Sequence, residues 1–195
     1  MTSATDLTID AVSEAMTKLA AILEPTDGGI LSRETEIKAL MRDLLAIPGL
    51  EQAPVAEVTM TEEGQDVRLA TLFDNGGLRL TRGRLPAGFI QRPHNHGAWN
   101  VFAVYSGAVH YRSYNRLDDC SKPYFADLEI AEDGVMYAGD VTVLPEPPND
   151  IHVTVALARE NITLLVAPGQ FAPQREQYVP ELNTYYDVDA ARAAR

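Results

Sequence analysis

Two histidines lie close together in the segment PHNHGAW, residues 93–99 of this 195-residue chain. In an extended segment, residues two apart point to the same side, so His94 and His96 could hold one ion while Asn95 points to the other side. His152 lies in the later segment PEPPNDIHVTV, just after an Asn-Asp turn. A facial metal site needs a third imidazole from a different strand, because one strand cannot supply all three ligands. The three histidines form a candidate metal site, although a lone HxH pattern is also typical of ordinary loop histidines.

Glycines frame both histidine segments. Gly88 and Gly107 lie on either side of the first segment, and Gly139 precedes Pro145 by six residues ahead of His152. A glycine, five residues and HxH, followed later by a glycine, five residues, a proline and a histidine, resembles the two signature motifs of the cupin superfamily. Because both motifs occur in order within a β-rich region, the resemblance favours a metal site. It implies the jelly-roll barrel of that superfamily.

The sequence departs from the usual cupin pattern at the carboxylate ligand. Cupins usually place a glutamate after the second histidine with three or four residues between them, and here those positions are Asn100 and Val101. Three neutral imidazoles leave a divalent ion with its full double charge and about three open coordination positions. Such a centre prefers an anionic, bidentate substrate, and thiolates and enolates are the candidates. Imidazole suits both iron and zinc, so ligand type alone does not choose the metal.

The stretch over about residues 65–180 resembles the cysteine dioxygenase type of cupin, including bacterial relatives that act on 3-mercaptopropionate. The HxHG-x-W piece and the D-I-H-x-V piece are its most specific features. The resemblance implies Fe(II) held by His94, His96 and His152, a thiol-bearing carboxylate bound through its sulfur, and conversion of that thiol with O2 to a sulfinate. Zinc, nickel and manganese stay open as alternative metals.

The same resemblance implies two further site residues. That group typically carries Ser-x-His-x-Tyr on the strand after the third ligand. Here NITLLVAPG places Thr163, Leu165 and Ala167 at those positions, so only Thr163 keeps a hydroxyl. An arginine that pairs with the substrate carboxylate is expected on the strand before the first motif. Arg68 in DVRLATLFD is our candidate, although the best register puts Ala70 at that position.

Other charged residues have alternative roles. Arg82 and Arg84 share one face of the next expected strand and are the alternatives for the substrate carboxylate. Asp150 and Glu146 could orient His152 by accepting its free N–H, as outer-shell carboxylates often do. A role in the turn is the more ordinary interpretation of both acids.

Composition narrows the partners and the compartment. The formal net charge is −12, with 16 Lys and Arg against 28 Asp and Glu, so no basic stripe could follow a nucleic-acid backbone. The first residues show no apolar signal segment, and no run approaches the roughly 20 apolar residues of a membrane span. Cys120 is the single cysteine, which excludes an intramolecular disulfide and fits a reducing compartment. We expect a cytoplasmic monomer or homodimer whose partners are a small-molecule substrate and O2, with neither nucleic acid nor membrane.

The elements that must position these residues fall into three parts. Residues 1–54 have the helical period and are predicted to form a helical extension, with Ser32 as the N-cap of its second helix and Pro48 ending it. Residues 55–170 change to short β-branched and aromatic segments and are predicted to form an all-β double-stranded β-helix, the jelly-roll cupin barrel. Residues 171–195 are expected to be a C-terminal tail that wraps the barrel.

The expected elements have the following limits. The helical stripes are formed by Ile9, Val12, Met16 and Leu19 and by Ile37, Leu40, Met41, Leu44 and Leu45. The expected strands cover residues 67–73, 78–85, 99–106, 108–114, 125–130, 140–144, 152–156 and 162–166.

Three functional hypotheses follow. The leading one is a mononuclear non-haem Fe(II) dioxygenase that oxidises a small thiol to its sulfinate. The second keeps the iron but cleaves an enolisable, non-thiol substrate. The third is a cupin that binds a ligand or a structural metal without turnover.

Overall fold

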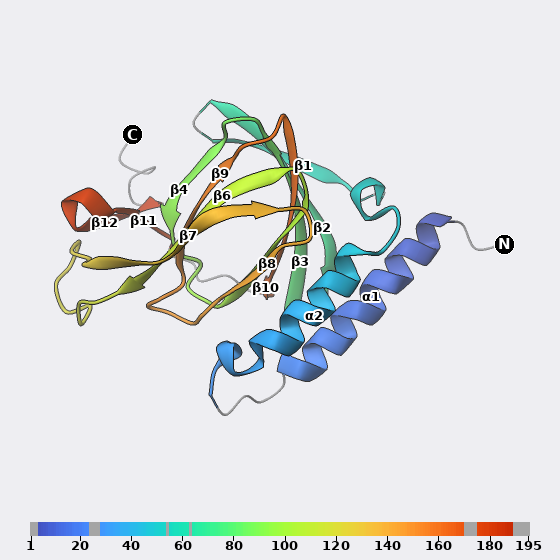
Figure 1. Cartoon of the computed structure of the whole chain (residues 1–195), viewed down its shortest axis with the longest axis horizontal. Coiled ribbons are helices and arrows are strands. Elements are labelled where there is room, and N and C mark those ends of the chain that lie inside the picture. Colours follow the sequence, from blue (N-terminus) through green and yellow to red (C-terminus); the bar gives the residue numbers. More distant parts are fainter. Residues whose placement is uncertain (1–3, 24–27, 54, 63, 170–174, 189–195) are drawn as a thin grey trace.

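The chain forms two α-helices packed beside two facing β-sheets in the residues that the structure describes, which are 4–23, 28–53, 55–62, 64–169 and 175–188 (Figure 1). The structure is a computed structural model. The helices are α1 (Ala4–Leu23) and α2 (Glu34–Leu45), and short 3-10 helices η1 (Ile30–Arg33) and η2 (Leu50–Gln52) precede and follow α2. Within these residues, no helix combines the length and the apolar character that crossing a membrane requires.

The two apolar helical stripes pack against one sheet, as the sequence predicts. Val12 and Met16 of α1 and Ile37 and Met41 of α2 are buried in one core with residues of that sheet. The expected N-cap is wrong, however. Ser32 lies inside η1, where its Oγ donates to Gly29 O at 2.7 Å, because the chain makes one 3-10 turn before α2 begins.

The barrel consists of two six-stranded antiparallel sheets. Sheet A has the order β1-β2-β3-β10-β5-β8, and sheet B has the order β12-β11-β4-β9-β6-β7. Successive strands from β3 to β6 alternate between the sheets, which is the double-stranded β-helix predicted from the sequence. The strands are β1 (Glu57–Glu62), β2 (Gln65–Asp74), β3 (Leu78–Pro86), β4 (Ile90–His94), β5 (Asn100–Ser106), β6 (Ala108–Arg116), β7 (Leu128–Tyr137), β8 (Val141–Leu144), β9 (Ile151–Ala156), β10 (Glu160–Pro168), β11 (Glu176–Val179) and β12 (Thr184–Asp187).

Seven of the eight expected strands agree closely with observed ones, and the expected strand at 125–130 is displaced. The observed β7 begins at Leu128 and continues to Tyr137, paired with β6. It is an edge strand exposed along most of its length, so it lacks the alternation of apolar residues that marks a half-buried strand. The sequence also missed β1, β4, β11 and β12, which are short, carry a proline or lie in the tail.

The described residues of the C-terminal tail, 175–188, extend sheet B. They form β11 and β12, which lie beyond β4 in that sheet. The backbone partner of Gln177 on β11 is His94 on β4, so the tail joins the sheet at a histidine of the candidate site.

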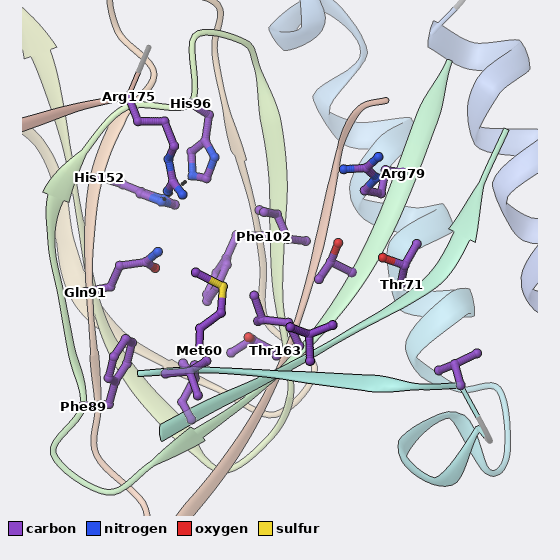
Figure 2. Close-up of a pocket in the computed structure, with 18 of the residues that line it drawn as sticks. Met60, Thr71, Arg79, Phe89, Gln91, His96, Phe102, His152, Thr163 and Arg175 are labelled. Atoms are coloured by element: carbon purple, nitrogen blue, oxygen red, sulfur yellow. Dashed lines mark hydrogen bonds between the residues drawn. The ribbon is translucent and has the colours of Figure 1, made fainter. Parts of the chain in front are cut away.

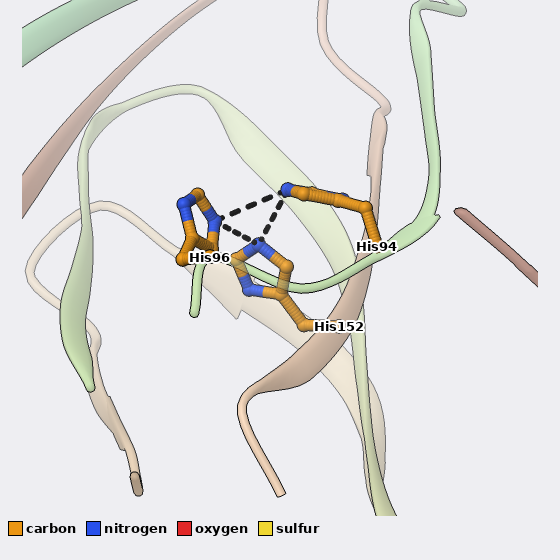
Figure 3. A group of neighbouring side chains, drawn as sticks. All are labelled: His94, His96 and His152. Atoms are coloured by element: carbon orange, nitrogen blue, oxygen red, sulfur yellow. Dashed lines mark hydrogen bonds between the residues drawn. The ribbon is translucent and has the colours of Figure 1, made fainter. Parts of the chain in front are cut away.

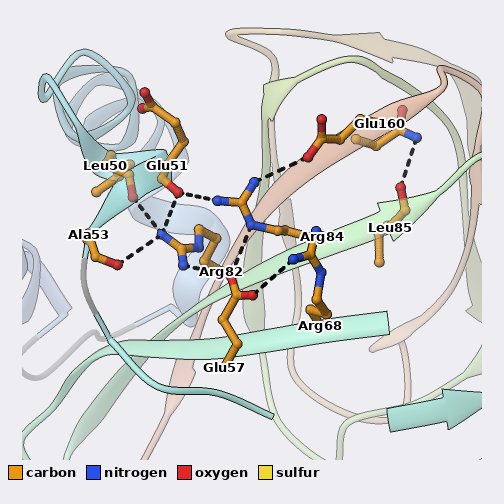
Figure 4. Close-up of polar contacts among 10 residues, drawn as sticks. Leu50, Glu51, Ala53, Glu57, Arg68, Arg82, Arg84, Leu85 and Glu160 are labelled. Carbon is orange, nitrogen blue, oxygen red and sulfur yellow. Dashed lines mark hydrogen bonds and ion pairs between the residues drawn. The ribbon is translucent and has the colours of Figure 1, made fainter. Parts of the chain in front are cut away.

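The helical extension is fastened to the barrel through Arg82 on β3 (Figure 4). The side chain of Arg82 is 3% exposed, and its Nη1 donates to Leu50 O at 3.0 Å and to Glu51 O at 2.8 Å. Its Nη2 pairs with Glu57 Oε1 at 2.9 Å, and Nε of Arg84 donates to the same oxygen at 3.0 Å. Both alternatives for the substrate carboxylate are therefore engaged by acceptors of the chain itself.

The change Arg82→Met should lower the free energy of unfolding by about 2–4 kcal/mol, because buried carbonyl groups and a carboxylate would lose their donor. Urea denaturation followed by circular dichroism measures this loss. The matched control is Arg33→Gln, which breaks the exposed pair with Glu36 and should cost less than about 1 kcal/mol. A loss below about 0.5 kcal/mol for Arg82→Met would contradict the anchoring role.

Candidate metal centre

The three predicted histidines meet at one end of the barrel (Figure 3). His94 ends β4, His96 lies in the turn that follows, and His152 lies in β9 directly opposite His94. The Nε2 atoms are 3.1 Å apart for His94 and His96, 3.1 Å for His96 and His152, and 3.2 Å for His94 and His152. The HxH turn and the β4–β9 pairing thus bring together ligand atoms from distant parts of the chain.

These separations fit a metal ion. Three nitrogens about 2.1 Å from one ion lie about 3.0 Å apart on an octahedral face and about 3.4 Å apart in a tetrahedron. The observed 3.1–3.2 Å is nearer to the octahedral face. A facial set of three ligands leaves the remaining positions for substrate and a second small molecule.

The protonation of the imidazoles also suits metal binding. Burial lowers the pKa values of His94 and His96 well below the usual range of histidine, and it lowers the pKa of His152 to about 3. The positive charge of Arg175 lowers all three pKa values further. His94 Nδ1 lies 2.8 Å from Arg92 O, which can only accept, so Nδ1 carries the proton and Nε2 presents a lone pair. The site therefore offers neutral imidazoles, the form that binds metals.

A buried carboxylate holds the turn that carries His96. Asp150 is 1% exposed, and its Oδ2 accepts the backbone N–H of His96 at 3.0 Å and of Gly97 at 2.6 Å. The sequence favours a turn role for Asp150 over orientation of the His152 ring, and the contacts of Asp150 agree with the turn role. The ring Nδ1 of His152 lies 3.3 Å from the Tyr111 hydroxyl, and Glu146 accepts the N–H of Ile30 at 2.9 Å.

The tail is locked to the HxH turn through Asn95, the residue between the two histidines. Asn95 Nδ2 donates to Glu176 Oε2 at 3.1 Å, and Asn95 Oδ1 accepts the Glu176 N–H at 2.8 Å. The Tyr178 hydroxyl donates to the same carboxylate oxygen at 2.6 Å. This double contact fixes the preceding residue, Arg175, whose side chain points toward His96 and His152 (Figure 2).

A cavity of about 630 Å³ runs through the barrel from the histidines. Both sheets line it, and its walls are mostly apolar (Figure 2). Phe102 of β5 stands beside the metal end, with its ring centroid 6.2 Å from that of His152. The residues that line the cavity are Val55, Ala56, Val58, Met60, Val67, Leu69, Thr71, Arg79, Thr81, Gly83, Leu85, Phe89, Gln91, His96, Phe102, His152, Thr163, Leu165 and Arg175.

Solved structures share this architecture. A chain from the crystal structures of the DMSP lyases RdDddP and RnDddQII is 18% identical and superposes with a TM-score of 0.53, covering 90% of this chain and 100% of that one. KdgF from Halomonas sp. is 16% identical with a TM-score of 0.45, covering 58% of this chain and 86% of that one. A cupin superfamily protein from Desulfitobacterium hafniense is 12% identical with a TM-score of 0.40, covering 57% of this chain and 84% of that one.

This chain has the cupin fold. No protein-family model matches its sequence, and no curated protein matches it either. At these identities the likeness concerns the fold alone, so the chemistry of this cupin must be argued from its own residues.

Of the two other predicted site residues, Thr163 lines the cavity and Arg68 does not. Thr163 on β10 lines the cavity of this cupin, and its Oγ1 lies only 2.9 Å from where a Cβ would stand at Gly83, so Gly83 leaves room for the hydroxyl. Arg68 does not line the cavity. It alternates with the lining residues Val67 and Leu69, and its Nη1 pairs with Glu57 Oε2 at 3.4 Å, so the expected contact with a substrate carboxylate is not supported.

Sequence reasoning missed one residue of the site. Arg175 stands in the tail, where neither periodicity nor a motif marks it, and it comes near the histidines through the pairing of β11 with β4. The sequence favours a turn role for Asp150, but the backbone donors that it holds in the HxH turn are not displayed by a sequence pattern. Asn100, at the position of the usual cupin glutamate, is fully buried and does not line the cavity.

The change Asp150→Asn should weaken metal binding about 10- to 100-fold, because the carboxylate that holds the HxH turn would become a neutral amide. Competition titration with a chromophoric chelator measures the affinity for Fe(II) and Zn(II). Asp140→Asn is the matched control, since Asp140 also accepts a backbone N–H, that of Tyr137 at 2.7 Å, but in an exposed turn on another part of the barrel. Equal affinities in both variants would contradict the role of Asp150.

Proposed function

We propose that this cupin is a mononuclear non-haem Fe(II) dioxygenase that oxidises a thiol-bearing carboxylate to its sulfinate. The observation that carries the proposal is the set of three buried, neutral imidazoles at the end of a cavity, with an arginine and no carboxylate beside their ligand atoms among the described residues that line it. The thiol follows from the sequence resemblance, and the geometry supports an anionic substrate.

The charge balance of the site favours an anion. A divalent ion held by three neutral ligands keeps its double charge, and the guanidinium of Arg175 adds a further positive charge at the same end of the cavity. Two acids contact the turn, and both are engaged: Asp150 accepts two backbone N–H groups, and Glu176 accepts from Asn95 and Tyr178. A thiolate on the metal and a carboxylate on Arg175 would together offset two of these three positive charges.

The reaction balances without a further reductant, since R–SH and O2 give R–SO2H with both oxygen atoms transferred to sulfur. Fe(II) would supply adjacent positions at which the thiolate and O2 meet. The described residues of the chain do the rest: His94, His96 and His152 hold the metal, and Arg175 orients the acid. Phe102 and its neighbours form apolar walls, and the Thr163 hydroxyl offers a hydrogen bond on the β10 side.

A second candidate is oxidative cleavage of an enolisable substrate. One observation favours it: Leu165 lines the cavity where thiol dioxygenases typically carry a polar relay residue, so the β10 wall is more apolar than a small polar thiol needs. Carbon–carbon cleavage products in place of sulfinate would identify this reaction.

Freshly purified protein should contain about one iron per chain, and the double change His96→Ala and His152→Ala should remove it, because two of three ligands would be lost. Elemental analysis measures the metal. The iron-loaded parent should then consume O2 with at least one of cysteine, cysteamine, 3-mercaptopropionate and mercaptosuccinate, and mass spectrometry should find the sulfinate. Metal without O2 uptake on thiols and on β-dicarbonyls would instead support a binding cupin, and zinc in place of iron would contradict the oxygenase.

The change Arg175→Gln should raise the KM for 3-mercaptopropionate about 10- to 100-fold, because a charge-assisted hydrogen bond to its carboxylate would be lost. Steady-state O2 uptake measures KM and kcat. Cysteamine, which has no carboxylate, should show little change. The matched control is Arg68→Gln, which removes an arginine that pairs with Glu57 outside the cavity and should leave KM unaltered. The opposite pattern, with Arg68→Gln raising KM, would restore the sequence-based assignment.

A further inference from the structure

We propose that the ligand of this cavity is an amphipathic acid: its anionic end lies at Arg175 and the histidines, and an apolar body of several carbons beyond the reacting group extends to Phe89 and Met60. This proposal rests on the proposed function only for the metal end. It goes beyond that function by assigning the rest of the barrel interior as a binding site for an apolar chain or ring.

The cavity is too large for a small thiol. At about 30 Å³ for each water-sized group, the seven heavy atoms of cysteine occupy about 200 Å³, whereas the cavity holds about 630 Å³. A ligand that fills it has about 20 heavy atoms, in the range of pockets that bind compact organic molecules. With cysteine bound, about two thirds of the space would be left to water against apolar walls.

The walls beyond the histidines are made for an apolar body. The lining residues of β2 alternate in the pattern Val67, Leu69 and Thr71, so three successive side chains of one face of that strand line the cavity. Phe102 and Leu165 continue this surface toward the metal end. Burial of a ligand against such walls raises its affinity by about fourfold for each methylene removed from water.

The positively charged end of the cavity is the end at which Arg175 lies beside the histidines. Two arginines line the cavity, and Figure 2 shows them on different sides of it, with Arg175 beside His96 and His152 and Arg79 far from them. Arg79 forms an ion pair with Asp74 at 2.8 Å on the surface. An acid that reaches Arg175 also lies beside the ion that the histidines would hold, in the same place where its reacting group must lie.

The end of the cavity opposite the histidines has two parts. A buried cluster closes one side of it, and the exposed edge strand β1 forms the other side. Val67, Leu85 and Phe89 pack together there, and Phe89 is 2% exposed. Beside them Val58 and Met60 of β1 line the cavity although they are 63% and 42% exposed. Because β1 is the edge of sheet A, these side chains form an apolar mouth through which an apolar body can reach the interior.

The test uses protein loaded with Zn(II), which binds the site without O2 chemistry, and titrates it with butanoate, octanoate and dodecanoate by calorimetry. Octanoate should bind roughly 250-fold more tightly than butanoate, which corresponds to about fourfold for each of four methylenes, and dodecanoate should bind at least as tightly as octanoate. Affinities that are equal along the series would overturn the proposal.

Arg175→Gln separates the two ends of the ligand. It should weaken octanoate binding tenfold or more while it leaves 1-octanol, which has the same body and no charge, unchanged. Equal losses for both ligands would overturn the assignment of the anionic end to Arg175.

Two changes at the far end should shift length preference in opposite directions, which a general loss of structure would not do. Val67→Phe shortens the cavity and should weaken dodecanoate tenfold or more while it spares butanoate. Phe89→Ala lengthens the cavity and should favour dodecanoate over octanoate more than in the parent. If Val67→Phe fails to fold, Phe89→Ala alone decides. The control Leu182→Phe alters an exposed residue that does not line the cavity and should change nothing.

The binding series and the O2 measurements fail independently. A clear length dependence on Zn(II)-loaded protein without any O2 uptake on the Fe(II)-loaded protein would refute the proposed function and keep the amphipathic ligand. Rapid oxidation of cysteine together with a flat binding series would do the reverse.

Discussion

Three imidazole lone pairs that point at one another from 3.1–3.2 Å repel each other, and a cation among them turns that repulsion into ligation. Much of the barrel end is organised to hold this arrangement. The β4–β9 pairing sets His94 opposite His152, and Asp150 fixes the backbone at His96 through two N–H groups. Burial then keeps the rings uncharged, since an imidazolium would lose its hydration without gaining a counter-charge. Holding three lone pairs close together is unfavourable, and the stability of the rest of the fold must offset it. That fold includes a helical layer anchored through Arg82.

The site is assembled from segments that are far apart in sequence, and the tail is one of them. Asn95 has no ligand role, yet its side chain is the part of the HxH motif that grips Glu176. Asn95, which points away from the metal site, thus holds β11 in place through Glu176. Arg175 directly precedes β11 and lines the cavity. Metal geometry and anion recognition are therefore coupled through a single turn, because any movement of Asn95 shifts both neighbouring histidines and the tail strand.

The histidine set and the jelly roll could be predicted from the sequence because both have local signals: spacing around glycines for the first, and alternation between turns for the second. The arginine beside the histidines could not be predicted in the same way. Arg68, Arg82 and Arg84 all lie on strands near the expected position, but the side of the strand on which each lies decides its role. All three form ion pairs with Glu57 on β1, a strand that the sequence did not reveal. Arg175 became the cation at the site through strand pairing in the tail, and pairing partners over such distances leave no periodic trace in a single sequence.

The two properties of the cavity, a concentrated positive charge at one end and apolar walls elsewhere, constrain the substrate more tightly together than either does alone. A small polar acid satisfies Arg175 and the metal but leaves Phe102, Leu165 and the β2 face in contact with water. A purely apolar molecule covers those walls but brings no negative charge to the ion and to the guanidinium of Arg175. Only a molecule with both parts gains at each end, because removal of its body from water is favourable while its acid replaces water around the cations. In the proposed function, Asn100 at the position of the usual cupin glutamate and the apolar β10 wall would suit the same substrate, one that brings both a negative charge and an apolar body.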